Sequence, residues 1–294
     1  MALEPPLRVF VMGCSRGGTT VTQRLVAERL ALHTLPETRF YASLIGNTEA
    51  RMFPTTARRP PLLRGVTSRL REALGLSTGM EWRDVTLDAP RRRKWSPVGH
   101  ISADFVTAMD GAAKAAGKAG WLEKTPFHVH YARQIARLIP DPWMIHLLRD
   151  PQETVASIRD AAIRYPQSWG VTYASVERAV DNWNASVADA TAMLDQPRQI
   201  FLPYEAVARA PEAVMDRVAR LMGHQGPASP LDASALVTDR EGWKADVTAT
   251  VTPAASKWQT ALTPPERQAA TALIRPIPAA LHHAMIPFLN LIPR

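Results

Sequence analysis

The segment from residue 7 to about residue 32 constrains the fold most, because an apolar run there is followed by a glycine-rich turn and then by a helix-forming stretch. Residues 7–12 (LRVFVM) are apolar and partly β-branched, which predicts a buried strand. Residues 13–20 (GCSRGGTT) form the turn. A turn of this kind gathers backbone N–H groups at the positive end of the helix dipole. The segment therefore predicts a binding site for phosphate or sulfate.

A second unit of the same kind begins near residue 141. Residues 143–148 (WMIHLL) predict another buried strand. The next helix has a well-marked start, because Asp150 can be its N-cap and Pro151 occupies its first position. We expect Glu153 to complete a capping box there.

Later residues continue this alternation of strands and helices. Residues 198–205 (RQIFLPYE) are a third strand candidate. Further helices are expected over residues 103–119, 128–138 and 211–222. Such an alternation predicts an α/β domain in which a parallel sheet has helices on both faces. We expect a single domain over residues 1–294.

The positive charge of the chain is concentrated in one segment. The chain carries 35 Lys and Arg against 27 Asp and Glu. Between residues 51 and 100 there are eleven basic and four acidic residues, which give +7 of the total +8. We expect residues 51–100 to be a basic lid and acceptor-side insertion. A solvated loop and an anionic lipid surface remain alternatives, whereas nucleic acid is not expected, because only Trp95 accompanies the basic run 91–94 and no recognition motif is present.

Cysteine and histidine usage exclude several other classes. The single cysteine, Cys14, excludes an intrachain disulfide framework and a cysteine-based zinc site. The eight histidines show no spacing with carboxylates that suggests zinc, so no metal is expected. No run of about 18 apolar residues predicts a membrane span, and residues 1–8 lack a signal-peptide core. We therefore expect a cytoplasmic protein, with peripheral membrane contact left open.

The glycine-rich turn departs from the common nucleotide loops. The spacing of Gly13 and Gly18 matches the start of a nucleoside-triphosphate loop, but Thr19 and Thr20 stand where that loop has Lys and Ser or Thr. No Gly-x-Gly-x-x-Gly pattern occurs there. A P-loop kinase or NTPase stays as an alternative function, which the missing lysine disfavours.

The turn resembles the 5′-phosphosulfate loop of sulfotransferases that use 3′-phosphoadenosine 5′-phosphosulfate (PAPS). The family pattern is a strand, Gly-x-x-(Arg/Lys)-(Ser/Gly)-Gly-Thr-(Thr/Ser), and a helix. The resemblance implies that Arg16 contacts the phosphosulfate oxygens and that Gly17, Gly18, Thr19 and Thr20 cradle the 5′-phosphate. It also implies a P-loop-like three-layer fold with a central parallel sheet flanked by helices. The family usually has Ser where this chain has Gly17.

Three other segments resemble the same family. Arg149 and Ser157 match a 3′-phosphate site, in which an arginine at a strand end and a serine on the next helix hold that phosphate. Two helical turns separate Ser157 from the N-cap, which puts both groups on one side. A salt bridge from Arg149 to Asp160 or to the N-cap aspartate is the structural alternative. Tyr204, in a Tyr-Glu pair, would lie near the adenine, and Lys257 would belong to a segment that closes over the cofactor.

Candidate catalytic residues follow from the same resemblance. Glu37, in Pro-Glu-Thr-Arg-Phe, matches the proposed base of bacterial and carbohydrate-type members; alternatively, it pairs with Arg39 on a surface turn. Lys124, in Glu-Lys-Thr-Pro, would join Arg16 in stabilising the phosphate or sulfonyl oxygens, unless it is simply exposed at a strand end. His128 is the alternative base, and a helix cap or a partly buried core position is its structural alternative.

The resemblance implies transfer of a sulfuryl group from PAPS to a hydroxyl or amine of a carbohydrate, lipid or small-molecule acceptor by in-line displacement, without a metal. By analogy with phosphoryl transfer, positioning and electrostatics should supply most of the rate. A non-catalytic protein that binds an anionic ligand through its basic segment is the remaining alternative.

Overall fold

The computed structural model describes residues 6–56, 98–232, 236 and 256–293. Most of the basic segment expected to form a lid, residues 57–97, lies outside the described residues. Within them, no helix is both long and apolar enough to span a membrane.

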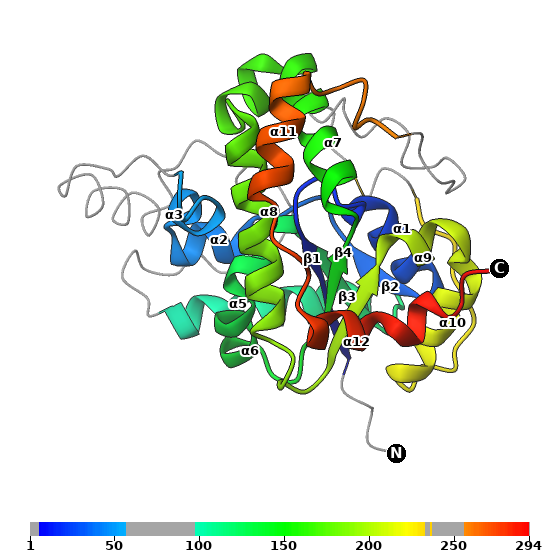
Figure 1. Cartoon of the computed structure of the whole chain (residues 1–294). Helices are drawn as coiled ribbons and strands as arrows, with labels where there is room; N and C mark the ends of the chain where they lie inside the picture. Colours follow the sequence, from blue (N-terminus) through cyan, green and yellow to red (C-terminus); the bar gives the residue numbers. More distant parts are fainter. Residues whose placement is uncertain (1–5, 57–97, 233–235, 237–255, 294) are drawn as a thin grey trace.

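The centre of the fold is a parallel sheet whose described strands run in the order β2-β3-β1-β4-β5 (Figure 1). These strands are β1 (Leu7–Gly13), β2 (Leu32–Thr34), β3 (Gly120–Lys124), β4 (Trp143–Leu148) and β5 (Gln199–Pro203). The predicted strands over residues 7–12 and 143–148 are confirmed as β1 and β4, which pair directly. The third predicted strand is two residues too long at its C-terminus, because Tyr204 already begins a helix after Pro203.

Helices cover both faces of this sheet. They are α1 (Thr19–Arg29), α2 (Phe40–Ile45), α3 (Thr48–Met52), α5 (Val98–Ala115), η2 (Pro126–Tyr131), α6 (Ala132–Leu138), α7 (Pro151–Arg164), η3 (Pro166–Gly170), α8 (Val176–Thr191), α9 (Tyr204–Arg209), α10 (Pro211–Leu221), α11 (Pro264–Leu273) and α12 (Ala279–Leu289). The predicted helix over residues 211–222 is α10, and the one over residues 103–119 lies a few residues earlier, as α5. The helix predicted over residues 128–138 instead divides into the 3₁₀ helix η2 and α6, because the backbone of Tyr131 leaves the helical region.

Alternate residues of β1 face two different helix layers. Val9 and Val11 pack in the cluster formed with α1, α9 and α10. Phe10 and Met12 pack in the cluster formed with α2, α5, η2, α6, α7 and α8. A strand that is buried on both faces needs the continuous apolar run that the sequence shows. The predicted three-layer α/β fold, with a central parallel sheet flanked by helices, is confirmed.

The carboxyl ends of β1, β3 and β4 meet at one edge of the sheet, because the strands are parallel. β1 lies between the other two, so the loops that follow all three strands converge beside the start of α1. Gly13 allows this close approach: a Cβ there would lie 2.3 Å from the carbonyl oxygen of Leu147 on β4. In open α/β sheets, ligands bind at such an edge.

Candidate functional site

The loop after β1 is shaped by its glycines. The N–H of Gly17 donates to the carbonyl of Cys14 at 3.0 Å, and a Cβ on Gly17 would lie 2.9 Å from that oxygen. Gly18 is the N-cap of α1 with φ of 94°, and a Cβ there would lie 2.3 Å from the ring of Tyr204. No side chain caps the N-terminus of α1, where Thr19 and Thr20 form the first turn. Backbone N–H groups of this turn can therefore serve an anion.

Two arginines from different strand ends meet at this loop. Arg149, directly after β4, donates from Nη1 to the carbonyl oxygen of Arg16 at 3.1 Å. Arg16 donates from Nε to Oγ of Ser157 on α7 at 3.3 Å. The guanidinium of Arg149 lies 5.0 Å from the ring centroid of Tyr204, while that of Arg16 lies 5.7 Å from the ring of Trp169. The structure thus brings four predicted site residues together.

The charges of these two arginines repel each other. Burial lowers the pKa of Arg16 from its ordinary value; the charge of Asp160 raises it, and the charge of Arg149 lowers it further. An arginine nevertheless remains cationic at neutral pH. Among the described residues Arg149 has no ion pair, and Asp160 pairs instead with Lys257 and Arg164. A polyanionic ligand would relieve the repulsion between the two arginines, and each can contact phosphate in bidentate fashion.

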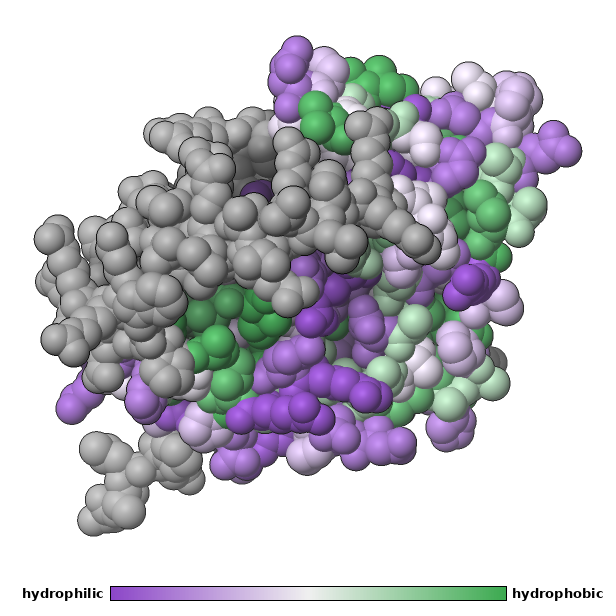
Figure 2. All heavy atoms as spheres, turned by 90° about the vertical axis from the view of Figure 1, so that its left-hand side faces the viewer, coloured by the Kyte–Doolittle hydropathy of each residue, from purple (hydrophilic) through white to green (hydrophobic). Residues whose placement is uncertain are grey.

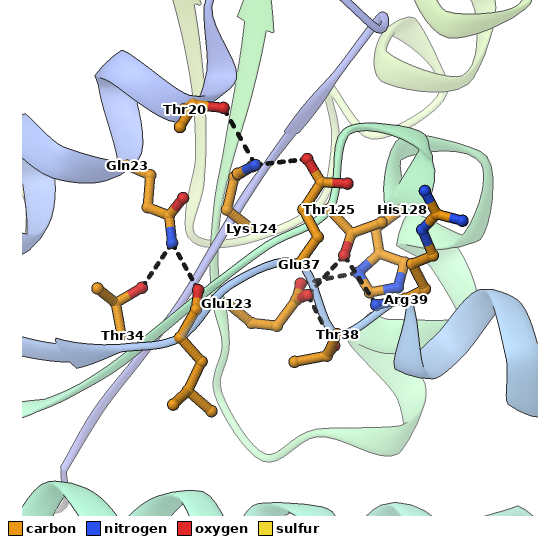
Figure 3. A network of polar contacts seen from close by, with 11 residues as sticks. Thr20, Gln23, Thr34, Glu37, Thr38, Arg39, Glu123, Lys124, Thr125 and His128 are labelled. Carbon is orange, nitrogen blue, oxygen red and sulfur yellow. Dashed lines mark hydrogen bonds and ion pairs between the residues drawn. The ribbon is translucent and has the colours of Figure 1, made fainter. Parts of the chain in front are cut away.

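A buried ion pair lies beside the loop (Figure 3). Nζ of Lys124, at the end of β3, lies 2.6 Å from Oε1 of Glu37 and 3.2 Å from Oγ1 of Thr20. Lys124 is completely buried and Glu37 is 8% exposed, so neither the exposed lysine nor the surface turn considered from the sequence is correct. The side chain of Arg39 lies over the ring of Phe127. A buried cation and a buried carboxylate need each other, because a lone buried charge is unfavourable.

His128 occupies a different environment. It is completely buried, and its ring lies near those of Tyr41 and Tyr131. Its Nδ1 lies 2.8 Å from Oε2 of Glu123 (Figure 3). Burial would raise the pKa of Glu123, but His128 and two threonine hydroxyls outweigh burial and hold that pKa below its usual range. Since an ionised carboxylate only accepts hydrogen bonds, Nδ1 of His128 carries the proton.

The start of α7 differs in one respect from the sequence prediction. Asp150 caps the helix, since its side chain accepts from the N–H of Glu153 at 2.9 Å. The capping box is wrong, however, because the N–H of Asp150 donates to Oε1 of Glu205 at 2.8 Å. The carboxylate of Glu153 is free to accept from Oγ of Ser256 and the N–H of Lys257. No sequence pattern predicts this role of Glu205, which holds the backbone next to Arg149.

Lys257 is held against α7 by two contacts. Its N–H donates to the carboxylate of Glu153, and its Nζ pairs with Asp160. The charge of Asp160 also acts on Arg16. The segment predicted to close over the cofactor therefore contacts α7, the helix that carries Ser157. The sequence around Lys257 does not predict these contacts, because Glu153 and Asp160 are about a hundred positions away in the chain.

Cys14 is a buried residue of the loop after β1. Its sulfur accepts from Nδ2 of Asn182 at 3.5 Å, and burial raises the pKa of the thiol to about 12. The thiol is therefore protonated at neutral pH and a poor nucleophile. Across the described ranges, no three His, Cys, Asp or Glu side chains form a group that could hold a metal ion.

Comparisons with known proteins identify the family of the chain. The model of the sulfotransferase family matches residues 6–226. A comparison with curated protein sequences found no match. Among solved structures, the sulfotransferase domain from the curacin biosynthetic pathway is similar, with 15% identity, a TM-score of 0.50, and coverage of 98% of this chain and 99% of that one.

Two further solved structures are similar over most of their length. The sulfotransferase domain from the Synechococcus PCC 7002 olefin synthase has 16% identity and a TM-score of 0.48, with 97% of this chain and 95% of that chain covered. Sulfotransferase STF9 from Mycobacterium avium has 17% identity and a TM-score of 0.48, with 92% and 76% covered.

Proposed function

Since the chain belongs to the sulfotransferase family, and is therefore an enzyme of the transferase class, we propose that it moves a sulfuryl group from PAPS to a hydroxyl or amine of a carbohydrate, lipid or small-molecule acceptor. The observation that carries this proposal is the convergence of two cationic sites and a buried Glu37–Lys124 pair at one edge of the sheet. The cationic sites suit the phosphates of the cofactor, and the carboxylate of the Glu37–Lys124 pair suits the proton of the acceptor.

The residues present fit PAPS. Arg16 and the N-terminus of α1 would hold the 5′-phosphosulfate, where Gly17 and Gly18 leave no room for a side chain. Arg149 and Ser157 would hold the 3′-phosphate. The aromatic ring of Tyr204, beside the loop, would lie near the adenine. The segment of Lys257 would close over the bound cofactor. When bound, PAPS supplies an activated sulfuryl group that a nucleophilic oxygen or nitrogen can take.

We assign the base role to Glu37. Its carboxylate would take the proton of the acceptor as the acceptor oxygen or nitrogen attacks sulfur, with the 5′-phosphate of the cofactor as the leaving group. Lys124, which already bridges Glu37 and Thr20, and Arg16 would stabilise the negative charge left on that phosphate. The positive charge of Lys124 also favours the ionised form of Glu37 before the reaction. His128, which is enclosed and engaged with Glu123, has a supporting role instead.

Two measurements test this function. Titration calorimetry should show that adenosine 3′,5′-bisphosphate binds more tightly than ATP, because only the bisphosphate has a 3′-phosphate for Arg149 and Ser157. Incubation with ³⁵S-labelled PAPS and panels of carbohydrate, lipid and phenolic acceptors should then give a labelled product. Tighter binding of ATP would favour a kinase or NTPase. Tight bisphosphate binding without transfer to any panel would favour a non-catalytic binding protein.

A further inference from the structure

Glu123 is a buried charge that the proposed reaction does not use directly. Its side chain is at the end of β3 and is 1% exposed. Oε1 accepts hydrogen bonds from Oγ1 of Thr38 at 2.8 Å and from Oγ1 of Thr125 at 2.7 Å, and Oε2 accepts from Nδ1 of His128 at 2.8 Å. Burying an ionised carboxylate is unfavourable unless such donors surround it. A buried carboxylate held by three donors therefore indicates a specific function for Glu123.

The role follows from the alternation of side chains along two facing segments. Glu123 and Lys124 are consecutive residues of a strand, so their side chains leave on opposite faces. Glu37 and Thr38 are consecutive in the segment opposite. Glu37 contacts Lys124 beside the phosphate loop, while Thr38 contacts Glu123 on the other side of the strand (Figure 3). The second pair thus fixes the same segment that carries the proposed base.

The backbone after Glu37 depends on the same anchor. Oγ1 of Thr125, which donates to Glu123, also accepts from the N–H of Arg39 at 3.2 Å. Oγ1 of Thr38 accepts from the N–H of Phe40 at 3.1 Å. Arg39 has φ of 53°, in the left-handed region that a residue other than glycine adopts only when its surroundings hold it there. Both hydroxyls that hold this turn converge on one carboxylate oxygen.

We propose that Glu123 is a positioning residue, whose carboxylate, oriented by His128, holds the turn after Glu37 so that Glu37 stays in contact with Lys124. The proposal rests on the assignment of Glu37 as the base. Glutamine cannot replace Glu123 fully, because it removes the charge and leaves one carbonyl oxygen where two carboxylate oxygens now accept from three donors. Glu123 touches no reacting atom in this scheme and acts only through Glu37.

The first test compares E123Q with two variants of Thr38. We expect E123Q to lower kcat by about 10²-fold, since a small displacement of a catalytic group has that effect. The bisphosphate should bind as in the wild type, because Arg16 and Arg149 are unchanged. T38V should lower kcat about tenfold through loss of a hydrogen bond to a charged group, and T38S should restore it. S102A, which removes the buried hydrogen bond between Ser102 and Tyr41, is the control for general loss of stability.

A double-mutant cycle separates positioning from a general structural effect. If Glu123 acts through Glu37, E123Q should lower kcat little further when Glu37 is already replaced by glutamine. Additive losses in the E37Q/E123Q double variant, or a wild-type kcat in both E123Q and T38V, would overturn the proposal. T38V keeps the test decisive if E123Q fails to fold.

A crystal structure of E123Q or T38V gives a readout that needs no activity. The proposal predicts that Glu37 moves away from Lys124, whereas an unchanged contact would contradict it. A wild-type enzyme that transfers no sulfuryl group would instead overturn the proposed function, and the variant structure would still decide whether Glu123 positions Glu37. The two failures are therefore distinguishable.

Discussion

Arg149 has two contacts that orient it toward the loop after β1. One is the hydrogen bond to the carbonyl of Arg16, and the other is the stacking of its guanidinium near the ring of Tyr204. Neither contact neutralises its charge. A residue that is held in place while it remains cationic is well prepared to bind an anion, because little side-chain entropy is lost on binding.

Replacement of Arg149 should therefore weaken cofactor binding selectively. We expect R149A to weaken binding of adenosine 3′,5′-bisphosphate by at least about tenfold, as for loss of a hydrogen bond to a charged group. R149K should be intermediate, because lysine lacks the bidentate fork. Titration calorimetry measures both. R133A, at an exposed arginine that contacts the carbonyl of Ala192, is the control. Equal affinities for R149A and R133A would refute the 3′-phosphate assignment.

Glu37 should affect chemistry and leave cofactor binding intact. Loss of a general base commonly lowers kcat by about 10² to 10⁴-fold. We expect E37Q to show such a loss in the labelled-PAPS assay, with bisphosphate affinity within about twofold of the wild type, since no phosphate contact is removed. E49Q changes a half-exposed carboxylate that pairs with Arg178 and should retain activity. Retained transfer in E37Q together with loss in H128Q would move the base to His128.

At the level of elements, α7 begins in a set of contacts that also fixes the site. Asp150 caps the helix, its own N–H donates to Glu205 on α9, and Glu153 holds the segment at Ser256. The helix start thus joins three parts of the chain around the residue after β4. The stability of this helix start and the geometry of the proposed 3′-phosphate site are therefore expected to be coupled.

Loss of the Asp150 cap should show this coupling. D150A should lower the free energy of unfolding by about 1 kcal/mol, the usual cost of losing an N-cap. It should also weaken bisphosphate binding, because the neighbouring Arg149 loses part of its support. D150S keeps a capping oxygen and should retain most of both properties. Urea unfolding and calorimetry on the same preparations measure them, and a D150A protein as stable as the wild type would show that the cap contributes little.

The units that sequence reasoning predicted well are local ones. The strand, turn and helix around Arg16 are contiguous in the chain, as are those around Arg149. In each unit the sequence pattern therefore predicts both the strand and the point at which it ends. The contacts of Glu153 with Ser256 and of Glu123 with Thr38 could not be predicted in this way, because these partners lie far apart in the chain and depend on the register between elements. The three-residue strand β2 is also too short to give a clear pattern.

For the whole molecule, the position of the charge is more informative than its sum. The net charge of +8 suggests an anionic partner. The face shown in Figure 2 mixes hydrophilic and hydrophobic side chains over its described part. In the proposed function, two arginines at adjacent strand ends and backbone N–H groups supply the specificity. Binding of a small polyanion at a fixed edge of a parallel sheet is the use that such an arrangement favours.

One buried histidine should make global stability depend on pH. His146 lies on β4, completely buried, with Nε2 2.8 Å from Oε1 of Gln199 and its ring stacked on Phe201. Its Nδ1 has no hydrogen-bond partner among the described residues. Burial lowers the pKa of His146 from 6.5 to about 4, and the hydrogen bond to Gln199 offsets only part of this effect.

The sign of the pH effect follows from proton uptake. As pH falls from 6.5 to about 4, the unfolded chain protonates this imidazole while the native protein does not, so the free energy of unfolding falls. The lost stability amounts to roughly 3 kcal/mol from this residue alone. H146Q cannot take up that proton, so urea unfolding should show a flatter dependence on pH across this range, whatever the stability of H146Q at pH 7. F201L, which disturbs the same packing without removing a titrating group, should keep the wild-type slope. Parallel curves for the wild type and H146Q would show that His146 takes up its proton as readily in the native protein as in the unfolded chain. The interior around β4 would then accommodate a charge.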